Sequence, residues 1–376
     1  MFPVTRNTLL LVFRGMAIFE FMFPANIFTS YRVAAFFTAV ILIACFISCQ
    51  LKKEKRQVDR GFYYWKSVLR LSGFEKQQLD SLHVQTLYIR FFDVDWDETT
   101  RSPIPLAKLQ GNGYRLPAGL SVIPTIFITN ECMQKTDSLQ VSLLADKIYS
   151  LMQEIIHNNG FNSIKEIQFD CDWTASTRPM YFLLLEKTKA LWKDASITLS
   201  ATIRLHQVKF ITKTGTPPAD RGLLMCYNMG NLKNPATRNS ILETTELKKY
   251  INHLSSYPLP LDVAFPLFSW KVVFRNNEYA GIIQQLPDSV FSPAFVTTNG
   301  NRYTITKDTV LQGYELRKGD VIRNEQSTIK ELSAAATEVN RYLKNTSLRV
   351  SLYHLDSVIL NKYSIHELEG IYNSLR

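Results

Sequence analysis

Cysteine is scarce in this sequence, with five residues among 376. Three of them, Cys132, Cys171 and Cys226, lie far apart and outside the N-terminal segment. Their number is odd, and no two of them have the spacing of metal ligands. We therefore expect neither a disulfide framework nor a cysteine-based metal site. We interpret the three residues as small buried apolar side chains.

Motifs of several enzyme classes are also missing. The sequence has no P-loop, no nucleophile elbow, no zinc-binding His-Glu-Xaa-Xaa-His and no glycine-rich phosphate loop at the start of a helix. These absences argue against nucleotide-dependent enzymes, serine hydrolases of the elbow type and zinc proteases. No motif indicates a cofactor, so we expect none.

The positive charge is not gathered into a nucleic-acid patch. The net charge is +10, and the densest basic run consists of Lys52, Lys53, Lys55 and Arg56. No module that interleaves basic and aromatic residues appears, so we do not expect a nucleic-acid partner. A basic run close to a membrane anchor is more simply explained by contact with anionic headgroups.

An apolar segment precedes this basic run. Residues 33–48 (VAAFFTAVILIACFIS) carry no charge and are too short for a bilayer span, which needs about twenty residues. The segment ends in Ser48-Cys49, which resembles a lipoprotein cleavage box. We expect residues 1–49 to be a signal peptide, Cys49 to be lipidated and residues 50–59 to be a linker. The protein would then be anchored to a membrane of the cell envelope. Cys45 is a second candidate for lipidation, and an uncleaved signal anchor is the alternative.

Eight apolar runs of strand length follow the linker, and helical segments separate many of them. Most are nearly continuous rather than alternating, which is typical of parallel strands covered on both faces. The eight runs are residues 61–65, 86–92, 123–129, 166–173, 197–203, 222–227, 261–268 and 348–355. The expected helices are residues 75–82, 142–158, 179–192 and 365–375.

This pattern predicts an α/β fold, a (β/α)8 TIM-type barrel over residues 60–376. An open doubly wound sheet is the alternative, which the missing phosphate loop weakens. Residues 271–345 interrupt the series between the seventh and eighth strands. They hold β-like pieces over 271–325 and a helix over 327–343 with Ser327 as its N-cap. We interpret them as a β-rich insertion on the rim of the barrel.

The pattern Phe-Asp-Xaa-Asp-Trp occurs twice, each time at the end of an apolar run. The first copy holds Asp93 and Asp95, and the second holds Asp170 and Asp172. The carboxyl ends of barrel strands carry catalytic groups, so up to four carboxylates could converge there. Trp96 and Trp173, beside them, would offer apolar platforms for sugar rings. The first alternative is that these carboxylates cap helices or bind loop amides at strand ends. The second is that they bind a divalent metal, but no histidine or calcium-loop spacing supports a metal site.

These segments resemble family-18 chitinase-like barrels. Residues 167–173 (IQFDCDW) are similar to the fourth-strand motif, residues 199–202 (LSAT) to the fifth strand and residues 225–228 (MCYN) to the sixth. The chain from residue 61 onward also resembles barrel lipoproteins of Gram-negative bacteria that are similar to glycoside hydrolases. The resemblance implies a carbohydrate-related function, with Tyr227 and Asn228 near the substrate.

The chain departs from the family motif at three positions. The motif's catalytic glutamate falls on Thr174, its first aspartate on Ile167, and the aspartate after the sixth-strand tyrosine on Asn228. The chitinase mechanism lacks its acid here and would lose a proton donation typically worth about 10²–10⁴-fold in rate. If the protein is a hydrolase, we expect Asp172 to be the acid and Asp95 or Asp170 its partner.

Other residues at strand ends are candidate ligand contacts. Arginines there could hold a carboxylate or phosphate of a ligand, and aromatic rings could contact its apolar surfaces. These candidates are Tyr64, Trp65, Arg90, Arg204, Trp270, Tyr353, His354 and Asp356.

Two functions remain open. The first is a glycoside-active enzyme of the cell envelope, and the second is a non-catalytic saccharide-binding or scaffold lipoprotein. Paired carboxylates in a cleft, one with a strongly raised pKa, would favour the enzyme. Aspartates bound by arginine, or a barrel mouth filled by the insertion, would favour the second.

Overall fold

The computed structural model describes residues 56–193, 196–284 and 286–376. The expected signal peptide, both candidate lipidation cysteines and most of the basic linker lie outside the described residues. Within the part that is described, no helix combines the length and the apolar character that a bilayer crossing requires.

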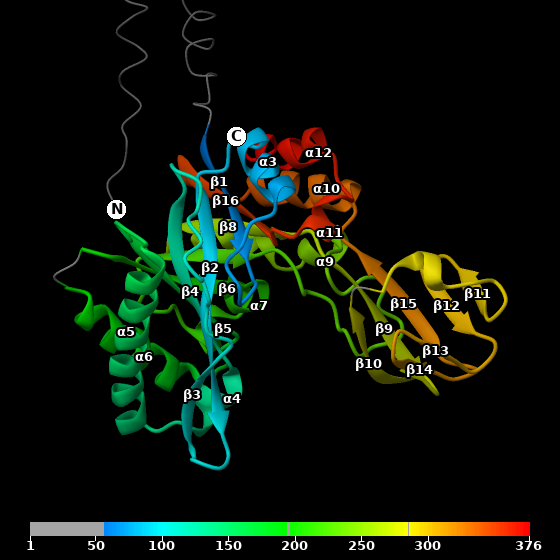
Figure 1. Cartoon of the computed structure of the whole chain (residues 1–376), viewed down its shortest axis with the longest axis horizontal. Coiled ribbons are helices and arrows are strands. Elements are labelled where there is room, and N and C mark those ends of the chain that lie inside the picture. The colour runs from blue at the N-terminus through cyan, green and yellow to red at the C-terminus, as the bar shows by residue number, and fades with distance from the viewer. Residues whose placement is uncertain (1–55, 194–195, 285) are drawn as a thin grey trace, which may run out of the picture. The chain divides into compact units, whose positions relative to one another are not determined.

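Eight parallel strands close into a barrel, which confirms the predicted fold class (Figure 1). Strand β1 pairs with β2 on one side and with β16 on the other, so this ring has no free edge. The eight strands are β1 (Gln57–Tyr64), β2 (Thr86–Asp97), β4 (Ser121–Ile128), β5 (Glu166–Cys171), β6 (Thr198–Arg204), β7 (Arg221–Met225), β8 (Leu261–Pro266) and β16 (Ser347–Tyr353).

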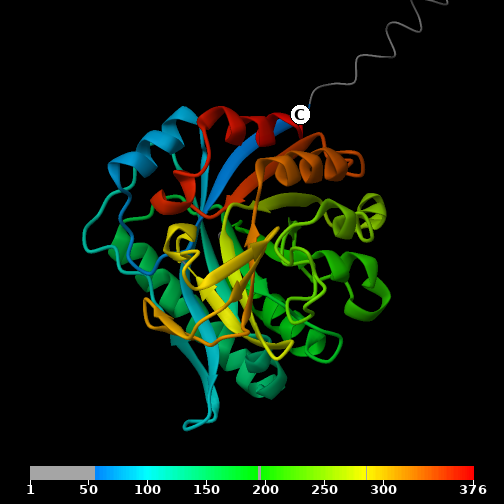
Figure 2. The same ribbon diagram turned by 90° about the vertical axis from the view of Figure 1, so that its right-hand side faces the viewer.

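Helices surround the strands on the outside, as Figure 2 shows. The longest helix among the described residues is α5 (Ser138–Asn159), which Asp137 caps in a capping box and which ends at Gly160 with a φ of 62°. The other helices that follow the strands include α3 (Gly73–Ser81), α4 (Asn130–Lys135), α6 (Arg178–Leu191), α7 (Leu205–Lys209), α8 (Ile211–Thr214), α9 (Thr244–Leu247), α11 (Ser357–Leu360) and α12 (Ile365–Asn373). A short strand, β3 (Ser102–Leu106), folds back on the extended end of β2.

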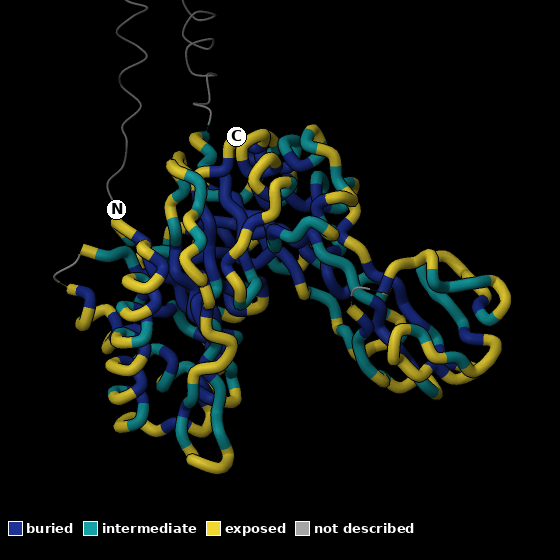
Figure 3. The backbone as a smooth tube through the Cα atoms, viewed as in Figure 1, coloured by how far each residue is buried: buried dark blue, intermediate teal, exposed yellow. Residues whose placement is uncertain are grey.

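The insertion lies between β8 and β16, as predicted. It forms an antiparallel sheet in the order β10-β9-β15-β12-β11 and a separate hairpin, β13-β14. Val273, Ile305 and Ile322 belong to its own small core, which is visible as buried segments in Figure 3. The strands are β9 (Ser269–Arg275), β10 (Glu278–Gln284), β11 (Val296–Asn299), β12 (Arg302–Ile305), β13 (Thr309–Leu311), β14 (Tyr314–Leu316) and β15 (Val321–Gln326).

Helix α10 (Ile329–Asn340) follows the insertion, and its N-cap differs from the prediction. Thr328 caps the helix by accepting from the backbone N–H of Glu331. Ser327 instead donates its hydroxyl hydrogen to the carbonyl of Phe268 at 2.9 Å. The predicted cap was one residue too early because either hydroxyl residue fits the sequence pattern.

Strand alternation divides the barrel core into two layers. Tyr63, Tyr88 and Leu223 belong to the interior layer, where Tyr63 and Tyr88 stack with their ring centroids 4.7 Å apart. Phe62 and Leu87, one position away, belong to the larger layer between strands and helices. Every second residue of a strand therefore points into the shared interior.

The three cysteines outside the N-terminal segment, Cys132, Cys171 and Cys226, are all buried and unpaired, as expected.

Charged residues in the amino-terminal half of that interior are paired around Arg349. Its guanidinium donates to Asp59 at 2.8 Å and to Glu166 at 2.9 Å, and its backbone N–H donates to Asp262. Arg221 also donates to Asp262, at 2.6 Å. These pairs come from strands that are remote in sequence, and they cross-link the start of the barrel strands. Because these charged groups are already paired with one another, the opposite, carboxyl end of the strands is where side chains are left to contact a ligand.

Candidate functional site

Two aspartates of the second Phe-Asp-Xaa-Asp-Trp copy point into the carboxyl-end rim of the barrel, here called the mouth. Asp170 lies on β5 and accepts from the Thr202 hydroxyl of β6 at 2.7 Å. Asp172, two residues on, faces Arg204 at the end of β6. Arg204 donates to both carboxylate oxygens of Asp172 through Nε and, at 2.7 Å, through Nη2. Period-two alternation thus puts both aspartates on one side, as the sequence predicted.

An aspartate of the first copy is also bound by an arginine. The two carboxylate oxygens of Asp93 accept hydrogen bonds from Arg90, one from Nε at 2.6 Å and the other from Nη2. Residues three apart on a regular strand face opposite sides, but the register of β2 against β4 shifts between Arg90 and Phe92. This bulge turns Arg90 and Asp93 to the same side. The Arg90 guanidinium also lies 5.7 Å from the ring centroid of Trp65.

Asp170 differs from Asp93 and Asp172 because no arginine among the described residues donates to it. Its pKa is raised from an ordinary 3.8 to about 6, first by burial and second by the nearby charge of Asp172. The Thr202 hydroxyl acts in the opposite direction. The site therefore holds one carboxyl that titrates near neutrality, although only 7 % of this residue is exposed.

Aromatic rings line the mouth beside these charges. We call this set the mouth aromatic cluster; it consists of Tyr63, Trp65, Tyr227, Phe268 and Tyr353. Tyr353 is at its centre, with ring centroids 5.5 Å from Tyr63, 5.6 Å from Trp65 and 5.5 Å from Tyr227. Trp65 and Tyr353 are half-buried, whereas Tyr63 and Tyr227 are buried.

Sequence reasoning named Trp65, Tyr227 and Tyr353 but missed Tyr63 and Phe268. The signal for both was available. Tyr63 is two residues before Trp65, and Phe268 is two residues after the end of β8, so alternation places each on the interior side.

Two predicted ligand contacts, Tyr64 and Trp173, are wrong for a ligand at this mouth. Both are fully buried in the layer between strands and helices. The Trp173 indole donates to the carbonyl of Thr214 at 3.0 Å and stacks on Tyr181. The Tyr64 hydroxyl donates to the carbonyl of Val68 at 2.7 Å. Tyr64 directly follows the inward residue Tyr63, and Trp173 directly follows the inward residue Asp172. Strand alternation therefore turns both rings outward, toward the helices.

The remaining candidates of the first copy lie outside the mouth. Trp96 belongs to the part of β2 that pairs with β3, and it packs against the outer core. Asp95 accepts from the Thr129 hydroxyl at 2.7 Å and from the backbone N–H of Trp96 at 2.8 Å. Asp95 therefore fixes the ends of β2 and β4, which is the structural role given above as the alternative.

Asn228 and His354 lie at the rim with different environments. Asn228 is exposed, has a φ of 52° and donates its backbone N–H to the carbonyl of Ile241. The His354 ring is 5.2 Å from the Tyr353 ring, and burial lowers the pKa of His354. Asp356 is bound instead by Lys66 and by the first backbone N–H groups of α11.

Trp270 joins the barrel to the insertion. Its indole donates to Glu325 at 2.7 Å, and the same carboxylate oxygen accepts from the hydroxyl and backbone N–H of Ser240. Glu325 also pairs with Arg323, and both residues are fully buried. Arg323 donates in turn to the carbonyls of Asn234 and Leu232. This network holds the insertion against the loop after β7. The Trp270 ring also contacts the ring of Phe268, with centroids 5.2 Å apart.

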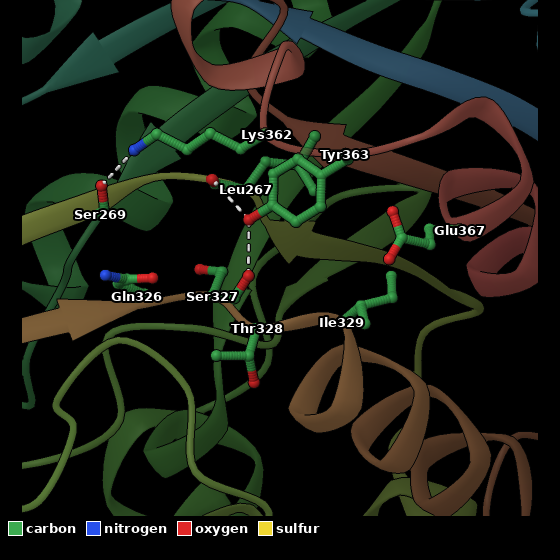
Figure 4. A pocket seen from close by; sticks show the side chains of 9 residues that line it. All are labelled: Leu267, Ser269, Gln326, Ser327, Thr328, Ile329, Lys362, Tyr363 and Glu367. Carbon is green, nitrogen blue, oxygen red and sulfur yellow. Dashed lines mark hydrogen bonds between the residues drawn. The ribbon is translucent and has the colours of Figure 1, made fainter. Parts of the chain in front are cut away.

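A separate pocket lies where the chain enters and leaves the insertion (Figure 4). Lys362 reaches across it to donate to Ser269, and Tyr363 donates to the carbonyls of Leu267 and Ser327. None of the residues predicted for the site lines this pocket. In the described part of the chain, no group of three or more histidine, cysteine, aspartate or glutamate side chains could hold a metal ion.

This arrangement is better suited to binding a ligand than to transferring a proton to it. Asp93 and Asp172 are held by arginines, and Asp95 is engaged at the strand ends. Asp170 is the remaining carboxylate, and no arginine or lysine pairs with it among the described residues. Aromatic faces and fixed guanidinium groups are the features that bind the faces and oxygens of sugars.

Substitution Asp170→Asn should change stability in a pH-dependent way. The folded state binds the Asp170 proton more tightly than the unfolded state, so wild-type stability falls as pH rises from about 4 to about 6. The variant should gain ~3 kcal/mol in free energy of unfolding at about pH 8 and almost nothing at about pH 4. Denaturant unfolding at both pH values measures this, with the exposed Asp146→Asn as the control. A loss of stability at the higher pH would contradict the assignment.

Comparison with known proteins finds similarity only at the level of structure. No protein-family model matches the chain, and no curated protein matches it by sequence. The C-terminal domain of a proposed chitinase from Desulfitobacterium hafniense aligns with a TM-score of 0.52 and 11% identity, over 86% of this chain and 100% of that one.

Two further structures align to a similar degree. The spore cortex-lytic enzyme SleL of Bacillus megaterium has a TM-score of 0.50 and 12% identity, over 86% of this chain and 76% of that one. A class V chitinase of Nicotiana tobaccum in complex with NAG4 has a TM-score of 0.50 and 12% identity, over 83% and 98%. The chain is thus a TIM barrel with distant structural similarity to family-18 chitinases and to cortex-lytic enzymes.

Proposed function

We propose that this protein is a saccharide-binding barrel of the cell envelope, which holds a glycan at its mouth without using the chitinase mechanism. The observation that carries the proposal is the bidentate pair between Arg204 and Asp172, beside a mouth lined by aromatic rings. Both oxygens of this carboxylate accept hydrogen bonds from one guanidinium, so the group is engaged within the protein and is not available to a glycosidic oxygen.

The composition of the mouth supports binding. Trp65 and Tyr353 supply half-buried ring faces, and Arg90 is fixed over Trp65 by Asp93. Rings whose positions are set by packing lose little conformational freedom when a ligand binds, which favours affinity. The structurally similar Nicotiana tobaccum chitinase is described with NAG4, a saccharide, bound, and a saccharide is the class of ligand that we propose for this mouth.

A second candidate function is hydrolysis through two carboxylates. One observation favours it: the pKa of Asp170 is raised by burial to about 6, the range of a general acid. In that scheme Asp170 would donate the proton and Asp172 would be its partner, after release from Arg204. The strong engagement of Asp172 is the reason this candidate ranks second.

The location rests on the sequence alone. The apolar segment at residues 33–48 and the Ser48-Cys49 step support export and lipidation at Cys49. The basic run after Cys49 would then lie against anionic headgroups. We propose the periplasmic side of a membrane as the place of action.

Binding depends on Trp65 if the mouth is the site. Trp65→Ala should lower the affinity of the full chain for its best polysaccharide by about tenfold or more, because a stacked ring is worth about 1–3 kcal/mol. Trp96→Ala, which removes an equal ring outside the mouth, should leave affinity unchanged. Affinity electrophoresis against peptidoglycan, chitin and plant or host glycans provides the measurement. Equal losses in both variants would count against a site at the mouth.

Hydrolysis is tested by release of reducing ends from the same glycans. We expect no release by the wild type beyond that of the Asp170→Asn/Asp172→Asn variant, because Asp172 is held by Arg204 and the two carboxylates therefore cannot work together as acid and base. Release that the variant loses, with both proteins equally folded, would establish the second candidate and overturn the proposal of binding alone.

Lipidation is tested by labelling with a fatty acid in cells. The wild-type chain should incorporate the label and sediment with membranes, and Cys49→Ser should abolish incorporation because the acceptor thiol is gone. Cys45→Ser is the matched control and should keep the label. Loss of label in the control alone would move the site to Cys45.

A further inference from the structure

Arg204 has hydrogen-bonding capacity that the protein does not use. Its Nε and Nη2 atoms face the two carboxylate oxygens of Asp172. Its Nη1 atom is buried and has no acceptor among the described residues. A buried donor without a partner is costly, and most such groups in native proteins have one. The group therefore points to an acceptor that is not part of the chain.

The unused part of the guanidinium has a defined shape. Asp172 occupies the edge formed by Nε and Nη2, so the edge formed by Nη1 and the second hydrogen of Nη2 remains. Two parallel N–H groups on one edge match the two oxygens of a carboxylate. Because Asp172 fixes the plane of the guanidinium, this second edge is preorganised before any ligand arrives.

The surroundings place that edge within the mouth. Arg204 is in register with Met225 of β7, and Tyr227 follows two residues later on the same inward side. The ring centroid of Tyr227 lies 5.5 Å from that of Tyr353. Tyr353 contacts Trp65, the ring on which we place the sugar. The chain as a whole carries a net charge of +10, which attracts polyanions over long distances.

We propose that the mouth selects acidic glycans, in which a sugar carboxylate binds the free edge of Arg204 while the sugar ring lies against Trp65 and Tyr353. This inference rests on the proposed function and narrows its ligand class. A neutral glycan would leave Nη1 without a charged acceptor and would gain nothing from the net positive charge of the chain. Arg204 is then the residue that determines specificity, and Asp172 is the residue that positions it.

The experiment compares carboxylated polysaccharides with their carboxyl-reduced counterparts, in which each carboxylate has become a hydroxymethyl group. Polygalacturonate, hyaluronan and polysialic acid are the probes, and isothermal titration of the full chain gives the affinities. Wild-type protein should bind at least one carboxylated polymer about tenfold or more tightly than its reduced form, the range of a charge-assisted bidentate contact. This preference should shrink as salt is added.

Two double variants identify the residue responsible. Arg204→Gln/Asp172→Asn removes both charges together and should abolish the preference while retaining a common, weaker affinity for both polymers. Arg275→Gln/Asp320→Asn removes a bidentate pair of the same kind in the insertion, where Nη2 of Arg275 lies 2.7 Å from Asp320, and should keep the preference. Unfolding midpoints confirm that both variants fold.

The outcomes separate the two proposals. Equal affinity of the wild type for a polymer and its reduced form would overturn the selection of acidic glycans while leaving saccharide binding in place. Persistence of the preference in Arg204→Gln/Asp172→Asn would also overturn it, because another group would then hold the carboxylate. Failure to bind either form, together with failure on the neutral glycans tested above, would overturn the proposed function itself.

Discussion

The interior of the closed barrel holds its charged side chains mainly as ion pairs. Alternate residues of eight strands face one interior, and a charge placed there must find a partner or lose its ionised form. At the amino-terminal half Arg349 satisfies Asp59 and Glu166. At the mouth Arg204 satisfies Asp172. The same requirement leaves Asp170, which lacks a cationic partner among the described residues, with a raised pKa.

A buried charge pair also ties the insertion to the barrel. Arg323 and Glu325 bind the backbone of the loop after β7 and the indole of Trp270. Trp270 contacts Phe268, a member of the mouth aromatic cluster. The insertion is thus connected to the mouth through fixed contacts, which makes its position part of the geometry of the site. Removing one partner of such a buried pair would leave an uncompensated charge and strongly destabilise the protein.

The sequence predicted the barrel well because apolar runs of strand length report directly on strands buried from both sides. It predicted the inward direction of Asp170 and Asp172 for the same reason. It went wrong on Trp173, where the repeated motif was given more weight than strand alternation, which turns that ring outward. It could not foresee that Arg90 faces Asp93, because the bulge in β2 leaves no sequence signal, nor that Arg204 meets Asp172, which depends on register between two strands.

A crystal structure of the full chain with its best-binding oligosaccharide would show directly where the glycan binds. We predict a sugar ring on Trp65 and Tyr353, with the Arg204–Asp172 pair intact and the glycosidic oxygen away from every carboxyl group. A ligand bound elsewhere, such as in the pocket between Ser269 and Lys362, would contradict the assignment of the mouth. A structure in which Asp172 leaves Arg204 and approaches the glycosidic oxygen would contradict binding without catalysis.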